Sequence, residues 1–220
     1  MPRSKRDRRV TLAKAGKKVL TRDVKSKIVD EIRGAVDRYG NAYVLEIENS
    51  RNELLNNARS VFKNSKFYFG RNQICKVALG VDTSSEYADG ISEIGKHLSG
   101  QTCLLFTDRD FETVKSDLQS CEDTTFARSG FVSSEKVVIE KGKLEEFKVS
   151  QEAHLRELGL PVSIVKGDVV LLADYTVCTE GETLTPEKAK LLEHRGIQMA
   201  VFKLTPICCW KKDEGFELLR

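Results

Sequence analysis

The spacing of apolar residues in the first half of the chain predicts helices that alternate with short strands. An amphipathic helix is indicated where apolar residues recur every four positions opposite charged ones, at Val24, Ile28, Ile32 and Val36. Short apolar runs at 43–47, 66–69 and 103–107 fit strands, and helical periodicity lies between them. Because strands separated by helical segments are typical of βα units, we predict an α/β domain with a mostly parallel sheet.

The pattern changes near Thr124, where helical periodicity fades. Short strands are predicted at 136–140, 162–165 and 169–173, with one helix at 151–158. A helix that begins at Thr185, with Pro186 next, and a strand at 199–204 then return to the style of the first half. We therefore expect a mixed α+β module inserted into the α/β domain. The expected parts are a basic N-terminal arm (1–22), the α/β domain (23–127 and 183–210), the inserted domain (128–182) and a C-terminal tail (211–220).

Charge is distributed unevenly along the 220 residues, although the formal net charge is only +3. Residues 1–27 contain eleven Lys and Arg against Asp7 and Asp23, a formal charge of +9, so the remainder carries −6. A short basic arm on a mildly acidic body is typical of nucleic-acid-binding proteins, because clustered cations displace counterions from a phosphate backbone. The same run resembles a nuclear localisation signal, and a merely solvated terminus is the alternative interpretation.

Membrane and secreted classes lack a signature in the sequence. No apolar stretch approaches the roughly 18 residues needed to cross a bilayer, and the first thirty residues hold no apolar signal-peptide core. We therefore expect a soluble intracellular protein. The six cysteines form no C-x-x-C pair and lie in apolar contexts, which favours reduced, mostly buried thiols.

Catalysis, metal binding and cofactor binding are not indicated either. His97, His154 and His194 are each expected to sit alone, and no known nucleophile, zinc or phosphate-loop motif occurs. The acidic clusters at 145–146 and 180–182 fit neither a calcium site nor a two-metal site. We therefore expect no enzyme activity, no metal and no cofactor, with a catalytic site assembled from distant residues as the alternative.

The loops after the first two predicted strands are the candidates for contacts with RNA phosphates. In an open α/β sheet, ligands gather beside strand ends, where helix N-termini point unpaired N–H groups outward. Gly70 allows close approach of the backbone, Arg71 can bond a phosphate through two N–H groups, and Asn72 can cap the helix or contact a sugar or base. The candidate loop residues are Asn49, Ser50, Arg51, Asn52, Gly70, Arg71 and Asn72.

Cations outside these loops extend the predicted RNA-binding surface. Those on the body are Arg59, Lys63, Lys66 and Lys76, and those on the arm are Arg3, Lys5, Arg6, Arg8, Arg9, Lys14, Lys17 and Lys18. For each body cation, ordinary solvation of a helix surface is the alternative. The consecutive aromatic residues at 67–69 are interpreted as strand core and not as base-stacking platforms.

Six segments in a fixed order along nearly the whole chain carry a family resemblance. They are the opening MPRSKR, Phe69-Gly70-Arg71-Asn72 followed by Ala78-Leu79-Gly80, residues 100–108 (GQTCLLFTD), Ala127-Arg128-Ser129-Gly130, Leu158-Gly159-Leu160-Pro161 and residues 177–184 (VCTEGETL). Together they resemble the mRNA turnover protein 4 family, whose members are ribosome assembly factors and paralogues of the stalk-base protein of the large ribosomal subunit.

The resemblance implies a stalk-base-protein-like α/β RNA-binding domain with an inserted second domain. It further implies an assembly factor of the large (60S) subunit that binds rRNA of the stalk base, also called the GTPase-associated region. Such a factor resides in the nucleolus and nucleus, with shuttling to the cytoplasm. The implied partners are the pre-60S particle, a neighbouring stalk-base ribosomal protein and a phosphatase-like release factor, and the protein is expected to be monomeric outside the particle.

The C-terminal end departs from the pattern of the mature stalk-base protein. The chain ends at Arg220, soon after the last predicted strand, without the long helical spine and acidic tail on which the small stalk proteins assemble. We therefore expect a nuclear placeholder that is later exchanged for the mature protein and has no role in translation-factor recruitment. A structural ribosomal protein retained on mature subunits is the alternative.

Overall fold

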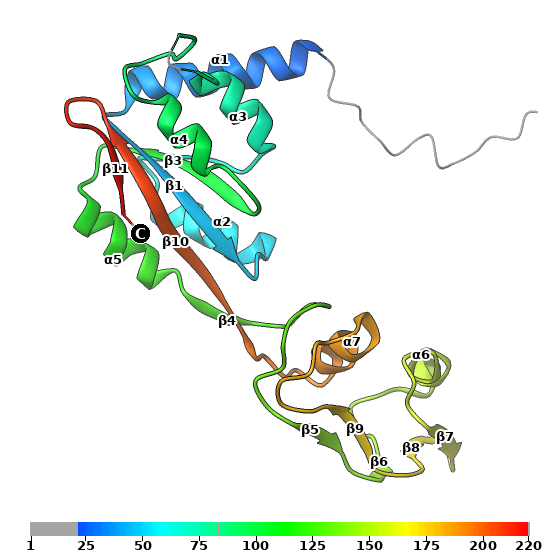
Figure 1. Cartoon of the computed structure of the whole chain (residues 1–220). Helices are drawn as coiled ribbons and strands as arrows, with labels where there is room; N and C mark the ends of the chain where they lie inside the picture. The colour runs from blue at the N-terminus through cyan, green and yellow to red at the C-terminus, as the bar shows by residue number, and fades with distance from the viewer. Residues whose placement is uncertain (1–21, 83, 220) are drawn as a thin grey trace, which may run out of the picture.

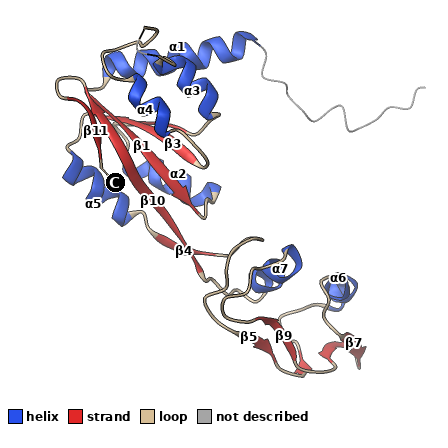
Figure 2. Ribbon diagram, viewed as in Figure 1, coloured by secondary structure: helices blue, strands red, loops and turns tan. Residues whose placement is uncertain are grey.

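The chain folds into two lobes joined by one long strand in the computed structural model, which describes residues 22–82 and 84–219 (Figure 1). The first lobe is a sheet covered by helices, and the second combines short strands with helices (Figure 2). β10 (Ala200–Lys211) belongs to the first sheet and extends toward the second lobe, where β4 (Asp123–Thr125) pairs with its beginning. The chain therefore leaves the first lobe after β4 and returns to it through β10.

The first-lobe sheet has the strand order β11-β10-β1-β3-β2, and each of these pairs is antiparallel. The other four strands are β1 (Asn41–Glu48), β2 (Lys66–Tyr68), β3 (Thr102–Thr107) and β11 (Gly215–Leu218). Our prediction of a mostly parallel sheet is wrong. β1 and β2 do run in the same direction with a helix between them in sequence, but β3 lies between them in space and is antiparallel to both.

Helices cover both faces of this sheet. α1 (Arg22–Arg38), α3 (Asn72–Leu79) and α4 (Ser92–His97) pack on one face, whereas α2 (Asn52–Val61) and α5 (Phe111–Ser120) pack on the other. Side chains alternate along β3, so Leu104 faces the α1 and α3 core and Leu105 faces the α2 and α5 core. No helix among the described residues is long and apolar enough to span a membrane.

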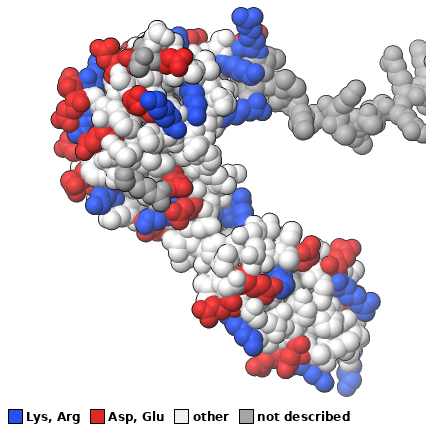
Figure 3. All heavy atoms as spheres, viewed as in Figure 1, with Lys and Arg blue, Asp and Glu red and all other residues white. Residues whose placement is uncertain are grey.

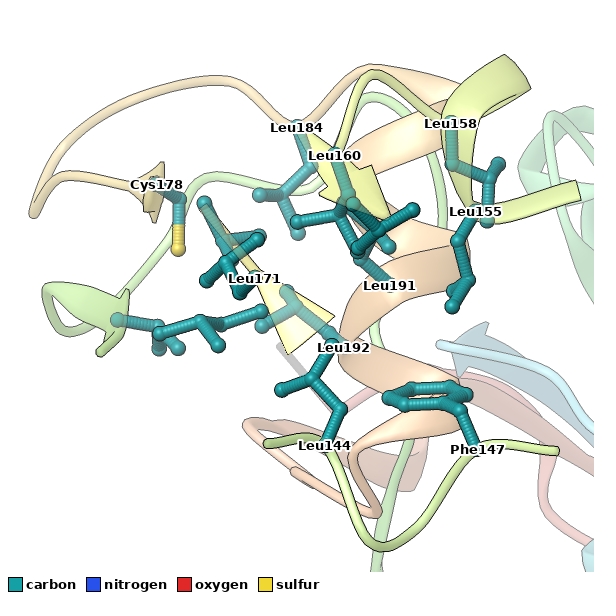
Figure 4. Close-up of a cluster of buried hydrophobic side chains, with 14 of the residues drawn as sticks. Leu144, Phe147, Leu155, Leu158, Leu160, Leu171, Cys178, Leu184, Leu191 and Leu192 are labelled. Atoms are coloured by element: carbon teal, nitrogen blue, oxygen red, sulfur yellow. The ribbon is translucent and has the colours of Figure 1, made fainter. Parts of the chain in front are cut away.

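The second lobe has a hydrophobic core of its own (Figure 4). Its strands form two small sheets, β5–β9 and β6–β8–β7. The elements of this lobe are β5 (Val137–Ile139), β6 (Gly142–Lys143), the 3-10 helix η3 (Val149–Gln151), α6 (Glu152–Glu157), β7 (Val162–Val165), β8 (Asp168–Leu171), β9 (Tyr175–Cys178) and α7 (Pro186–His194).

α7 packs in the second lobe, although we assigned residues from 183 onward to the first. The helix begins as predicted, because Thr185 Oγ1 accepts a hydrogen bond from the backbone N–H of Lys188 at 3.4 Å. Leu191 and Leu192 are fully buried in the second core, and Figure 4 shows them lying among its other leucines. A helix start is a local signal and carries no information about which core the helix joins.

The C-terminal segment is part of the sheet, so the expected tail at 211–220 is wrong. β11 pairs with the end of β10, with Phe216 opposite Trp210. β10 also continues well beyond the strand predicted at 199–204. Pro206 interrupts the sequence pattern there, but the β1–β10 pair accommodates it with a register shift between Val44 and Leu45, and pairing then resumes.

Candidate nucleic-acid interface

Three loops meet at one end of the first-lobe sheet, where β1 and β2 end and β3 begins. The backbone N–H of Ile47 donates to the Gln101 carbonyl at 2.8 Å, and Asn72 Nδ2 donates to the Gly100 carbonyl at 3.1 Å. The loops after β1 and β2 therefore lie at the same end of the sheet, because β1 and β2 are both antiparallel to the strand between them.

Two hollows flank the β2–α3 loop at this end. The first, of about 620 Å³, has walls from both faces of the sheet, including Ile28, Ile74 and Leu55. The second, of about 640 Å³, lies between α1 and α3. Both hollows are lined by Gly70, Arg71, Ile74 and Gly100, so the β2–α3 loop forms the rim that they share.

Gly70 and Arg71 are exposed at this rim. A Cβ added at Gly70 would meet no atom of the chain within 4 Å, and the backbone there does not adopt a positive φ. Nothing inside the described structure therefore requires glycine at position 70, and the missing side chain leaves the backbone open to a ligand. Arg71 makes no ion pair with any described residue, so its guanidinium is available for an external anion.

The N-terminus of α3 lies directly behind this rim. Arg71 is the N-cap residue, and its side chain makes no capping hydrogen bond. The first N–H groups of a helix have no partner inside the helix, and together with the helix dipole they favour a negative charge. Gly70, Arg71 and the start of α3 therefore combine an open backbone, a guanidinium and a helix N-terminus in one place.

Several candidate polar residues make internal contacts instead. Arg51 Nη2 donates to the Phe126 carbonyl at 2.8 Å, next to the junction of the lobes, and Asn49 Nδ2 donates to the Val201 carbonyl at 2.8 Å. The side-chain amide of Asn72 is engaged with Gly100. These three side chains hold the loops in place. Asn52 is exposed at the start of α2, and Ser50 lines the first hollow.

The four candidate cations on the body are dispersed. The Arg59 guanidinium lies 4.7 Å from the ring centre of Phe69, and Lys66 Nζ lies 3.7 Å from a carboxylate oxygen of Glu31. Lys76 packs against Gly95 of α4, on the side of α3 away from the hollows, and Lys63 is exposed just beyond the end of α2. The structure therefore does not gather these cations into one stripe with Arg71.

Sequence reasoning overlooked Lys25, which lines the second hollow together with Val29 one turn further along α1. That spacing of four residues places both on the face of α1 that looks toward α3. Figure 3 shows basic side chains gathered over the N-terminal end of α1. The eight candidate residues of the arm, from Arg3 to Lys18, lie outside the described residues.

Cysteine and histidine chemistry gives no competing site among the described residues. No group of three or more metal-binding side chains occurs there, and all six cysteines are free, five of them buried. Burial, with a smaller contribution from Cys209, raises the pKa of Cys208 to about 12, so its thiol stays protonated and unreactive.

The expectation that each histidine sits alone is wrong. The second core brings α6 and α7 together, and the ring centres of His154 and His194 lie 5.7 Å apart. Burial, then the charges of Lys190 and His154, lower the pKa of His194. His97 stacks on Phe216 with ring centres 5.5 Å apart. Forty residues separate His154 from His194, so sequence spacing could not reveal their contact.

Comparison with known proteins assigns both lobes. Residues 20–122 match the family model of ribosomal protein L10, and residues 127–197 match the model of the insertion domain in the 60S ribosomal protein of the same L10 family. The second match includes α7, in agreement with its packing. Large ribosomal subunit protein uL10 of Methanothermobacter thermautotrophicus is 24% identical over 56% of this chain and 36% of its own length.

Full-length relatives are more similar than that protein. "Ribosome assembly factor mrt4" of Dictyostelium discoideum is 33% identical over 97% of this chain and 95% of its own length. "Ribosome assembly factor MRT4" of Saccharomyces cerevisiae is 34% identical over 98% of this chain and 96% of its own length. None of these names describes an enzyme. Because the identity extends through both lobes, the chain belongs to the mrt4 family of ribosome assembly factors, which shares its domains with ribosomal protein L10.

Proposed function

We propose that this chain binds rRNA at the stalk base of the precursor large ribosomal subunit and holds that site until the mature stalk-base protein replaces it. The relatives are named ribosome assembly factors, which supports the role in assembly. The match to ribosomal protein L10 supports the location, because a shared domain suits a shared site. The observation that carries the proposal is the open rim at Gly70 and Arg71 between two hollows.

The rim suits an RNA phosphate for three physical reasons. Gly70 presents backbone without a side chain, so a phosphate can approach closely. Arg71 can hold two phosphate oxygens through parallel N–H groups. The uncapped start of α3 adds backbone donors and the positive end of a helix dipole. Lys25 at the second hollow and the cations of the arm add charge that depends little on exact geometry.

The placeholder role follows from the shared domain. Two proteins that use the same domain to bind the same RNA cannot occupy it together, so one must leave before the other binds. In this proposal the exchange requires a release factor, for which a phosphatase-like protein is the candidate, and the factor acts in the nucleolus and nucleus. The basic arm serves both RNA contact and nuclear import.

Binding to the isolated stalk-base rRNA fragment tests the proposal. The affinity of the full chain is measured by fluorescence anisotropy over a salt series, with the mature stalk-base protein added as competitor. About six phosphate contacts give a slope of about −4 to −5 in a plot of log affinity against log salt concentration. A flat salt response, or simultaneous binding of both proteins, contradicts the proposal.

Cell fractionation separates this function from that of a ribosomal protein retained on mature subunits. A placeholder sediments with precursor large subunits and is absent from translating polysomes, whereas a retained protein is found in both. A matched gradient probed for a known subunit protein controls for the integrity of the polysomes.

A further inference from the structure

One buried hydroxyl at the candidate interface has no hydrogen-bond partner. Thr102 is 7% exposed at the start of β3, and its Oγ1 is without a partner among the described residues. Side chains alternate along the strand, so Thr102 faces the same side as Leu104, toward α1 and α3. Thr102 also lines the first hollow. The unsatisfied hydroxyl therefore lies in the wall of a cavity at the RNA-facing end of the sheet.

An unpaired buried hydroxyl is unfavourable, and native proteins contain few. A ligand that bonds Thr102 Oγ1 removes this cost. A threonine hydroxyl can donate one hydrogen bond and accept others, so it can pair with either a carbonyl oxygen or a ring nitrogen. Glu46 lies opposite Thr102 across the β1–β3 pair, outside the described lining of the hollow.

The rest of the first hollow is mainly apolar. Ile28 and Ile74 form the wall from the helices, and Ile47 and Leu55 form the wall from the opposite face of the sheet. Phe69 contributes only part of its ring, because it stacks on Phe67 with ring centres 5.3 Å apart. The volume of about 620 Å³ is in the usual range for small organic ligands. The hollow therefore favours a flat, largely apolar group that carries a few hydrogen-bonding atoms at its edge.

Charge at the mouth of the hollow restricts the class of ligand further. Arg71 and Gly70 line the same hollow, and we have assigned them to a phosphate. A ligand with a phosphate at the mouth and a flat heterocycle inside is a nucleotide. Sequence-specific RNA recognition commonly uses bases that have left their stack, held by apolar contacts and by hydrogen bonds to their edges.

We propose that the first hollow receives one unpaired RNA base, whose edge hydrogen-bonds to Thr102 Oγ1 while the adjoining phosphate contacts Gly70 and Arg71. This inference rests on the proposed rRNA-binding function and adds sequence discrimination to it. Phosphate contacts position a protein on RNA without reading sequence, whereas a base in this hollow would select one nucleotide in the fragment.

The test combines one substitution with an RNA scan. Thr102→Val keeps the shape of the side chain and removes the hydroxyl, and no internal hydrogen bond is lost, so the thermal unfolding temperature should stay the same or rise. Affinity for the stalk-base rRNA fragment should fall about two- to tenfold, the range for a lost neutral hydrogen bond. Among fragments that each lack one unpaired base, a single one should bind more weakly, and Thr102→Val should cause no further loss with that fragment.

Thr205→Val is the matched control. Thr205 on β10 also has a buried Oγ1 without a partner, but it lines a different hollow beside α5. Its substitution changes the same chemistry two strands away from Thr102 and should leave the RNA affinity unchanged.

Each other outcome overturns the inference. If the wild-type chain binds the fragment with steep salt dependence but Thr102→Val binds equally well, the proposed function stands and the base pocket does not. If Thr102→Val weakens association with precursor subunits without weakening RNA binding, the occupant is a protein segment. If the wild-type chain does not bind the fragment at all, both proposals fail.

Discussion

The side-chain amide of Asn72 donates to the carbonyl of Gly100 at 3.1 Å, which fastens the first residue of α3 to the turn before β3. This bond crosses the mouth of the second hollow, which both residues line. It holds the Gly70-Arg71 rim against the sheet from one side. We expected Asn72 to cap the helix or contact RNA, and the structure instead shows it positioning the loop that carries the candidate contacts.

Asn72→Ala should therefore weaken RNA binding more than it weakens the fold. The bond is exposed, so its loss should lower the free energy of unfolding by about 1 kcal/mol or less. The freed loop must then be ordered on binding, which lowers affinity for the rRNA fragment severalfold. Chemical denaturation and anisotropy titration measure the two effects. Gln73→Ala, at the same hollow but without the bond to Gly100, should change neither, and an equal loss in both variants would exclude the positioning role.

Gly70→Glu should reduce affinity for the rRNA fragment about tenfold or more while the fold is retained. The new side chain has open space around it, so the thermal unfolding temperature should change little. Its carboxylate would lie where a phosphate is expected to approach, and hydrogen bonds to charged groups are worth about 1.5–3 kcal/mol. Unchanged affinity would remove this loop from the site.

Two alanine variants separate charge from backbone effects at the glycines on either side of α3. Gly70→Ala adds only a methyl group and should keep most of the affinity. Gly80 has a φ of +110°, and a Cβ there would lie 2.4 Å from the Cα of Glu86. Gly80→Ala should therefore destabilise the first lobe, as measured by thermal unfolding.

The sequence predicted local structure well where a single element determines the pattern. The stripe that contains Ile32 and Val36 is the buried face of α1, and the run at 103–107 is a fully buried strand. It failed where a long-range contact decides the outcome. No local pattern shows that β3 lies between β1 and β2, or that Leu191 is buried in the second core.

The candidate site divides in the same way. Gly70 and Arg71 could be selected from residue type and their position after a strand, and both are exposed at the rim. Arg51 and Lys76 have equally suitable side chains, but one is held by the Phe126 carbonyl and the other faces α4. Thr102 could not be found from sequence, because a hydroxyl is notable only once its missing partner is known.

Deletion of residues 1–21 should weaken RNA binding without unfolding the rest of the chain. The segment contains eight Lys and Arg, and each phosphate contact that is lost makes the log-log salt slope shallower by about 0.9. α1 begins at Arg22 and its buried residues begin at Ile32, so the thermal unfolding temperature should be unchanged. A variant with the eight cations replaced by Gln keeps the length and should show the same shallower slope. Loss of cooperative unfolding in either variant would show that the arm supports the fold.

The second lobe should lose stability in mild acid because of His194. Burial, Lys190 and His154 lower the pKa of His194 in the folded chain below its ordinary value of 6.5, so the unfolded chain binds the proton first. Protonation then favours unfolding, and stability falls as the pH drops through 6.5 toward the lower folded pKa. The thermal unfolding temperature should be lower at pH 5.5 than at pH 7.5, and His194→Gln should reduce this difference. His97→Gln in the first lobe is the control and should keep the wild-type difference, whereas a difference that persists unchanged in His194→Gln would assign the pH dependence to other groups.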